Sequence, residues 1–396
     1  MAIIVQKYGG SSVADTSRIM NVARRVVERK RRGDDVAVVV SAMADTTDDL
    51  ISLAKQIDEA PPERELDMLL TAGERISMAL LSIAIRKLGV RAASFTGSQS
   101  GIITDDDHTR ARIIDVLPTR IIETMNSGAV AIVAGFQGVS GKKEVTTLGR
   151  GGSDTTAVAL GVALGAEVCE IYTDVEGIFS ADPRRVASAR LIEELSFEET
   201  LDLAYFGAGV IHSRAVELAR VSRLPLLIAS SLVEREGTRI MSENRGMERP
   251  RFVGLSRRED VCFCRAELPD SRAVAELFGE AERERIQLGL SRAERTERGF
   301  NVSFLAEGKD AGSLSGLVQR FGLRVDPEVC LVGMVGEEIS RRPGVLAEAV
   351  SFLDSLGIVP HAVETTQISI AFVLKSSCGA ETEKALHEKF IRGDAF

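Results

Sequence analysis

Two glycine-rich turns carry the side chains that are best suited to hold a charged small molecule. In the first turn, Lys7 ends an apolar run and precedes the paired glycines Gly9 and Gly10. Paired glycines let the backbone turn sharply and approach a ligand closely. The N-terminus of a helix after such a turn offers unpaired N–H donors and a partial positive charge, which suit a phosphate. Taken alone, the same residues fit an ordinary strand-to-helix turn equally well.

The second turn spans residues 146–156 and contains Arg150, Ser153 and Asp154. A helix of small residues is expected directly after it, over 157–165. The glycine spacing of neither turn fits the common nucleotide fingerprints G-x-x-x-x-G-K-[ST] and G-x-G-x-x-G. A Walker-type NTPase and a dinucleotide-binding protein are therefore disfavoured.

Phosphoryl transfer to a carboxylate is chemistry that the two turns can support together. The transferred group needs backbone donors and a cation while its equatorial oxygens gain charge. Lys7 meets this need, and Asp154 is placed to orient Lys7 or a magnesium ion. If the acceptor is an amino acid, Arg150 suits its α-carboxylate and Glu74 suits its ammonium group.

Short apolar runs followed by polar loops predict a mainly parallel open sheet between helices. Ligands of such sheets bind beyond the carboxyl ends of the strands, where the polar loops of this chain recur. Strands are expected at 3–7, 36–40, 91–94, 129–134, 168–172 and 224–229, and helices at 17–31, 67–88 and 157–165. The order strand, helix, strand at the start predicts a right-handed βαβ unit.

Residues 241–251 have no apolar period and are predicted to form a linker. The predicted domains are therefore a body at 1–245 and a C-terminal region at 252–396. Within the C-terminal region, two ferredoxin-like α+β modules are expected at about 252–325 and 326–396. Their strands are expected at 261–265, 286–290, 302–305, 329–335, 358–364 and 368–374, and their helices at 343–356 and from residues 271, 311 and 380.

Composition excludes several classes of protein. A chain of 396 residues suggests two or three domains. Its net charge of −9 disfavours binding to nucleic acid or to an anionic membrane. No apolar run approaches the ~20 residues that span a bilayer, and no signal peptide is expected. Five scattered cysteines and four histidines lack zinc-ligand spacing, which favours a reducing, cytoplasmic location.

The motif K-Y-G-G-S-S-V at 7–13 closely resembles the K-F-G-G-[TS]-S-V signature of aspartate kinases. The resemblance continues through segments 39–43, 46–48, 67–74, 134–138, 146–156 and 170–175. It implies an amino-acid-kinase fold followed by two regulatory ACT domains, and a homo-oligomer assembled through them. It also implies that the γ-phosphoryl group of ATP, with Mg²⁺, is transferred to the β-carboxylate of L-aspartate, as the first step towards lysine, threonine and methionine or towards a specialised product.

The resemblance assigns roles to matching positions of this chain. Lys7 and Asp154 correspond to catalytic residues. The positions that correspond to aspartate-binding residues are Ser41, Thr47, Glu74, Arg150 and Ser153. Those that border the nucleotide are Lys7, Gly9, Gly10, Ser12, Thr173, Asp174, Asp182 and Arg184. No residue is assigned as a metal ligand.

Two departures from the family pattern carry expectations of their own. Gly209 stands where the family has a lysine on the nucleotide side, and losing that cation costs about 1–3 kcal/mol unless Arg184 or Lys142 replaces it. The first ACT module lacks the glycine of the usual Asp-x-x-Gly turn at 268–273, whereas the second keeps the family-like segment 341–345. Weakened feedback by lysine or threonine is expected, and the ACT modules are the expected place for an amino-acid effector.

Two alternatives stay open on the sequence. One is a kinase that phosphorylates a different amino-acid carboxylate in a specialised pathway. The other is a catalytically weak, amino-acid-sensing regulator on a kinase scaffold, which Gly209 favours and the intact set Lys7, Glu74, Arg150 and Asp154 disfavours.

Overall fold

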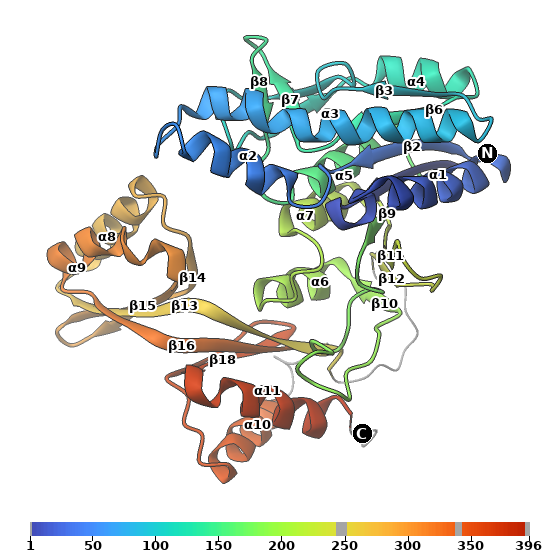
Figure 1. Ribbon diagram of the computed structural model, residues 1–396. Helices are drawn as coiled ribbons and strands as arrows, with labels where there is room; N and C mark the ends of the chain where they lie inside the picture. Colours follow the sequence, from blue (N-terminus) through green and yellow to red (C-terminus); the bar gives the residue numbers. More distant parts are fainter. Residues whose placement is uncertain (1, 243–251, 337–342, 393–396) are drawn as a thin grey trace. The chain divides into compact units, whose positions relative to one another are not determined.

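Strands and helices alternate through both halves of the chain in the computed structural model, which describes residues 2–242, 252–336 and 343–392 (Figure 1). The chain divides into two units. The first consists of Met1–Ile178, Leu191–Ala204 and Gly209–Arg245, and the second of Phe179–Arg190, Tyr205–Ala208 and Gly246–Phe396. Of the predicted linker at 241–251, residues 243–251 lie outside the described residues, as do Arg341 and Arg342 of the family-like segment.

An eight-stranded sheet forms the centre of the first unit. In spatial order its strands are β10 (Glu194–Ser196), β12 (Thr238–Met241), β11 (Leu226–Ser230), β9 (Val168–Thr173), β1 (Ile3–Tyr8), β2 (Asp35–Val40), β6 (Val130–Ala134) and β3 (Ala92–Phe95). All neighbouring pairs are parallel except β11 with β12. The sequence predicted no strand of this body after 224–229, which was wrong, because the chain turns back after β11 and adds β12 in the antiparallel direction.

The helices of the first unit connect its strands. They are α1 (Thr16–Arg31), α2 (Thr46–Lys55), α3 (Glu63–Lys87), α4 (Thr119–Asn126), α5 (Gly152–Leu164), α6 (Phe197–Tyr205) and α7 (Ser213–Ser222). Of these, α1, α3, α4 and α5 contact the eight-stranded sheet. A short 3₁₀ helix, Gly10–Val13, follows β1 in place of the α-helix N-terminus expected there. The α-helix begins later, and the Asp15 side chain caps it by accepting the Arg18 N–H at 2.8 Å.

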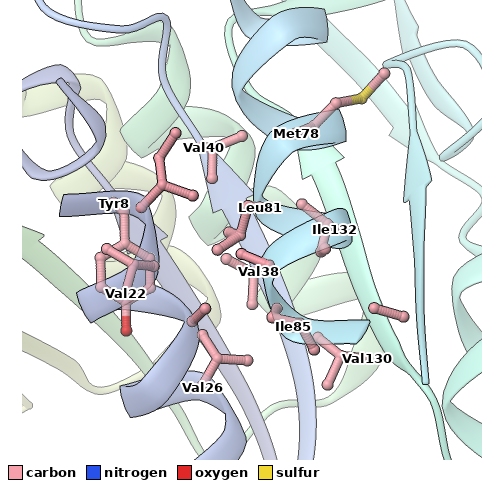
Figure 2. Close-up of a cluster of buried hydrophobic side chains, with 14 of the residues drawn as sticks. Tyr8, Val22, Val26, Val38, Val40, Met78, Leu81, Ile85, Val130 and Ile132 are labelled. Carbon is pink, nitrogen blue, oxygen red and sulfur yellow. The ribbon is translucent and has the colours of Figure 1, made fainter. Parts of the chain in front are cut away.

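One buried cluster joins α1 and α3 to the same face of the sheet (Figure 2). Residues of α1 (Val22, Val26) and of α3 (Leu81, Ile85) pack there against the end of β1 and against alternate residues of β2 and β6. Because successive side chains of a strand point to opposite faces, only one of each pair of neighbours reaches this cluster. Tyr8 does so at the end of β1, which leaves Lys7 pointing to the other face.

The helix α3 is long and apolar enough to span a membrane by length and composition alone. Half of its apolar window is buried inside the protein, and the core helix of a soluble protein passes the same test. Since α3 packs Leu81 and Ile85 into the cluster of Figure 2, its apolar character is explained by the core.

A separate four-stranded sheet lies within the first unit. Its order is β5 (Ile113–Val116), β4 (Ile102–Thr104), β7 (Gln137–Ser140) and β8 (Val145–Thr147). The strand β8 leads directly into the second glycine-rich turn, so this small sheet sets where that turn begins.

A six-stranded sheet forms the second unit. Its order is β14 (Leu288–Thr296), β15 (Gly299–Glu307), β13 (Gly254–Leu268), β16 (Arg324–Val335), β18 (Ser369–Lys375) and β17 (Ala362–Thr365). Its helices are α8 (Ser271–Arg283), the 3₁₀ helix Gly308–Ala311, α9 (Leu314–Phe321), α10 (Pro343–Ser355) and α11 (Ser376–Phe390). Two buried clusters, one under α8 and α9 and one under α10 and α11, correspond to the two expected modules.

The strand β13 belongs to both modules. Its first part, residues 254–258, pairs with residues 331–335 of β16, and after an irregularity near residue 260 its second part, 261–268, pairs with β15. The second module therefore takes its fourth strand from chain that precedes the first module. This exchange differs from the linear division at residues 325 and 326 expected from the sequence.

The cluster of Figure 2 makes a direct prediction about stability. Leu81 is fully buried, so Leu81→Ala is expected to lower the free energy of unfolding by about 2–5 kcal/mol through lost burial and a residual cavity. Ile83 lies on the same helix but is 64% exposed, and Ile83→Ala is expected to change it by no more than about 0.5 kcal/mol. Urea unfolding followed by circular dichroism measures both, and equal losses would contradict the packing described.

Candidate active site

A buried ion pair joins the two glycine-rich turns. The Lys7 ammonium lies 2.7 Å from Oδ1 of Asp154, and each side chain is only 11% exposed. Lys7 reaches α5 because the alternation along β1 turns it away from the cluster under α1 and α3. Asp154 sits in the first turn of α5, which begins at Gly152 rather than at residue 157 as expected. The sequence prediction that Asp154 orients Lys7 agrees with this contact.

Gly9 and Gly10 let the first turn pack closely against its neighbours. A Cβ at Gly10 would lie 2.9 Å from the carbonyl oxygen of Ala42, and one at Gly9 would lie 3.5 Å from Nζ of Lys7. The Gly9 N–H donates to the carbonyl oxygen of Tyr172 at 3.1 Å. This hydrogen bond holds the first turn to β9, and the role of Gly9 beside a phosphate stays a prediction.

Ser12, Thr173 and Asp174 come together beyond the ends of neighbouring strands. The Ser12 hydroxyl donates to Oγ of Ser231 at 2.7 Å, and the Ser231 N–H donates to the carbonyl oxygen of Thr173 at 2.8 Å. The Thr173 hydroxyl donates to Oδ1 of Asp174 at 3.0 Å. Three predicted nucleotide-side residues thus share one hydrogen-bonded edge after β1, β9 and β11.

Glu74 is a buried carboxylate with an unused oxygen. Its Oε1 accepts the Ala42 N–H at 3.3 Å, whereas its Oε2 is buried with no hydrogen-bond partner among the described residues. Burial raises the pKa of Glu74 to about 7. A buried acceptor without a donor is costly, and an ammonium group is the ligand that relieves this cost best. The predicted role of Glu74 is therefore consistent with its environment.

The remaining predicted acceptor-side residues lie after β2, β6 and β8. Ser41 directly follows β2, and its carbonyl oxygen accepts the Ser77 hydroxyl of α3 at 2.7 Å. Thr47 lies in the first turn of α2. Ser153 lies in the first turn of α5, where its Oγ would be 2.7 Å from a Cβ at Gly135. Because β1, β2 and β6 are adjacent and parallel, these residues share one edge of the sheet with Lys7.

Arg150 is exposed on a turn between two left-handed glycines. Gly149 has φ +74° and Gly151 has φ +70°, a region that residues with a Cβ rarely adopt. A Cβ at Gly151 would also lie 2.2 Å from the His212 side chain, so only glycine fits there. The turn therefore has a defined shape although the Arg150 side chain projects towards solvent.

Asp182 and Arg184 lie in the second unit and engage each other. The Arg184 guanidinium contacts the Asp182 carboxylate with Nε at 3.0 Å and Nη2 at 2.8 Å. This pairing holds the pKa of Asp182 below its usual value. Their segment is anchored within the second unit, where Oγ of Ser180 lies 2.9 Å from Nε2 of His387. The structure thus pairs these two predicted nucleotide-side residues with each other.

Comparison with known proteins decides the family. The family model described as "Amino acid kinase family" matches residues 2–230. The aspartokinase of Mycobacterium tuberculosis is 45% identical over 99% of this chain and 97% of its own length. This chain belongs to the aspartokinase family. The aspartokinase of Corynebacterium glutamicum is 42% identical over 99% of this chain and 97% of its own length.

Solved aspartokinase structures agree with this assignment. E. coli aspartokinase III in complex with aspartate and ADP matches with a TM-score of 0.84 at 26% identity, covering 98% of this chain and 99% of that one. The same enzyme in complex with lysine and aspartate matches with a TM-score of 0.76 at the same identity and coverage. The predicted amino-acid-kinase fold and kinase class are confirmed, and aspartokinases matched over nearly the whole chain do not favour either alternative.

Sequence reasoning missed an arginine that braces the aspartokinase turn carrying Arg150. Arg214 of α7 donates from Nη1 to the carbonyl oxygen of Leu148 at 2.7 Å and from Nη2 to that of Ala111 at 3.2 Å. Both acceptors are backbone atoms, so no pairing of residue types or spacing in the sequence indicates these bonds. Burial lowers the pKa of Arg214 below the ordinary value of an arginine.

The environment of Glu74 predicts a pH dependence of substrate binding. Its pKa is raised to about 7, and only the ionised carboxylate attracts an ammonium group. The KM for the amino-acid substrate is therefore expected to rise about tenfold as the pH falls from 8 to 6, with KM for ATP changing less. Initial rates across this range measure both constants. In Glu74→Gln the KM for the amino acid should be higher and independent of pH; a variant that keeps the wild-type profile would contradict the assignment.

Proposed function

We propose that this chain is an aspartate kinase that transfers the γ-phosphoryl group of ATP to the β-carboxylate of L-aspartate, forming 4-phospho-L-aspartate. The observation that carries the proposal is the buried pair of Lys7 and Asp154 at the end of β1. It places a fixed cation on the same edge of the sheet as the residues predicted to hold an amino acid. Membership of the aspartokinase family supports the choice of acceptor.

The proposed reaction is an in-line displacement. An oxygen of the β-carboxylate attacks the γ-phosphorus and forms an O–P bond, while the bond to the β,γ-bridging oxygen breaks and ADP leaves with that electron pair. Lys7 stabilises the charge that gathers on the transferred group, and Asp154 holds the Lys7 ammonium in place. Arg150 binds the α-carboxylate, Glu74 binds the ammonium group, and Ser41, Thr47 and Ser153 complete the aspartate site.

The nucleotide side is proposed to use the turn after β1 and the ends of β9 and β11. Its proposed members in the first unit are Lys7, Gly9, Gly10, Ser12, Thr173 and Asp174. Mg²⁺ bound together with ATP would neutralise part of the phosphate charge. Mg²⁺ in kinases commonly relies on substrate phosphates together with one or two carboxylates.

The C-terminal half is proposed to be regulatory. Residues 1–245 form the catalytic domain and 252–396 the regulatory region, in which two ACT modules bind an amino-acid effector and assemble a cytoplasmic homo-oligomer. The E. coli relative was solved in complex with lysine, which supports an amino acid as the effector class. Feedback by lysine or threonine is expected to be weak; strong inhibition of the purified enzyme by either at millimolar concentration would contradict this expectation.

Trapping of the acyl phosphate with hydroxylamine tests the function. Purified protein, ATP and Mg²⁺ are incubated with each of a panel of amino acids, and the hydroxamates are identified by mass spectrometry. Aspartate hydroxamate is the expected product. A hydroxamate of another amino acid alone indicates the kinase with a different acceptor. Amino-acid binding without any turnover indicates the sensing regulator, and either result overturns the proposal.

Lys7→Ala tests the central residue. Loss of the cation is expected to reduce kcat by about 10²–10³-fold while the dissociation constant for aspartate stays within about threefold. Lys87→Ala, at the exposed end of α3, is the matched control and should keep the wild-type kcat. Steady-state kinetics and calorimetric titration measure the two constants. Wild-type turnover by Lys7→Ala would contradict the proposal that Lys7 stabilises the transferred phosphoryl group.

Gly209→Lys tests the departure on the nucleotide side. No atom lies within 4 Å of a Cβ built at Gly209, so a lysine can be accommodated there. Restoring the cation is expected to lower KM for ATP about tenfold, and the control Gly209→Ala adds the Cβ without the charge and should not. An unchanged KM for ATP in Gly209→Lys would show that another group already supplies the missing charge.

A further inference from the structure

Asp67 is a fully buried carboxylate for which the proposed reaction has no use. It lies on α3 and is 0% exposed. Its Oδ1 accepts the Thr147 hydroxyl at 2.5 Å and the Thr109 N–H at 3.1 Å, and its Oδ2 lies 2.7 Å from Nδ1 of His108. A buried charge is costly unless it is well paired. The three partners offset this cost for Asp67, which indicates a specific structural role for its carboxylate.

The partners of Asp67 lie in two segments that build the turn carrying Arg150. Thr147 ends β8, three residues before Arg150. The backbone of the other segment supports that turn, since the Ala111 N–H donates to the carbonyl oxygen of Thr147 at 2.9 Å. The carbonyl oxygen of Thr109 lies 3.1 Å from a Cβ built at Gly149. Asp67 therefore connects both segments, the one with Thr147 and the one with Thr109, to α3.

Thr109 gives independent evidence that the contact is needed. Its φ of +65° is unfavourable for a β-branched residue, and such conformations persist only where the surroundings impose them. The Asp67 carboxylate accepts the Thr109 N–H with both oxygens, at 3.1 and 3.2 Å. The Asp67 carboxylate thereby stabilises the backbone conformation in which Thr109 contacts the turn at Gly149.

The helix α3 also carries Glu74, seven residues after Asp67. Residues seven apart lie on the same face of an α-helix, about 10 Å apart along its axis. One rigid helix thus holds Glu74 directly and holds the turn of Arg150 through Asp67. The two groups proposed to bind the charged ends of the amino acid are therefore spaced by the same element.

We propose that Asp67, together with His108 and Thr147, is a positioning residue that sets the distance between Arg150 and Glu74 and thereby the affinity for the amino-acid substrate. The proposal rests on the proposed aspartate kinase function. Asp67 touches no substrate in this scheme and acts through the Arg150 turn. The nucleotide side should be insensitive to it, because Lys7, Gly9 and Ser12 are held by β1 and its neighbours.

Thr147→Val and Thr147→Ser form the matched test. Valine has the shape of threonine but cannot donate to Asp67, whereas serine keeps the hydroxyl. Thr147→Val is expected to raise KM for aspartate about tenfold while KM for ATP stays within twofold, and Thr147→Ser should resemble wild type. A merely structural role would lower the melting temperature and the active fraction but leave KM for aspartate unchanged in the folded enzyme.

His108 supplies a second pair in case Thr147→Val does not fold. Its side chain is 19% exposed, so its replacement is tolerated more easily. His108→Ala should raise KM for aspartate, and His108→Asn, whose amide nitrogen can take the place of Nδ1, should restore it. In an Arg150→Ala background neither His108→Ala nor Thr147→Val should raise KM further, since the group they position is gone.

The outcomes separate this proposal from the proposed function. A wild-type enzyme that forms aspartate hydroxamate, with unchanged KM for aspartate in Thr147→Val or His108→Ala, overturns the positioning role alone. Additive increases of KM in the Arg150→Ala background also overturn it. A wild-type protein that neither phosphorylates nor binds aspartate overturns the proposed function, and the positioning role for aspartate with it.

Discussion

The first unit depends on bringing one buried cation to one buried carboxylate. Removing Lys7 and Asp154 from water is costly, and their attraction compensates only where the geometry is close. That geometry requires α5 to approach β1 more closely than large side chains would allow. The helix is accordingly built of small residues and is almost entirely buried. A Cβ at Gly161 would lie 2.8 Å from the Leu224 side chain and 3.7 Å from Val5 of β1, so glycine lets this part of α5 pack closely against its surroundings.

The polar interior of this unit has two kinds of members. Asp67 is satisfied by three partners, whereas Glu74 keeps an oxygen without one. A satisfied buried network makes a structure rigid, and an unsatisfied acceptor costs stability until a ligand arrives. Helix α3 therefore carries both a rigidly held carboxylate, Asp67, and a carboxylate whose charge state is sensitive to its surroundings, Glu74.

The sequence predicted the elements whose signal is local. Apolar runs located β1, β2, β6 and β9 because strands buried on both faces need continuous apolar side chains. The start of α5 was placed too late because glycine, serine and aspartate favour loops as well as first helical turns. Contacts to backbone atoms, such as Gly9 to Tyr172 or Arg214 to Leu148, leave no trace in residue types.

The candidate site residues were selected from a different kind of signal. Lys7, Glu74 and Asp154 are charged residues inside apolar or glycine-rich segments, so they stand out by contrast, and the structure places them in buried surroundings. Asp67 is equally buried, but its partners lie far away in the chain, and only the fold brings them together. Whether Asp182 and Arg184 meet a nucleotide stays a prediction, since the described contacts pair them with each other.

The shared strand β13 ties the two C-terminal modules into one inseparable piece. Residues 254–258 are synthesised before the first module. They can form their hydrogen bonds with residues 331–335 of β16 only after the first module has also been synthesised. Pairing between distant segments is slow because the loop must close before any contact rewards it. No single division of the sequence separates the two modules. Replacing the first module with that of a relative therefore requires two junctions within the six-stranded sheet.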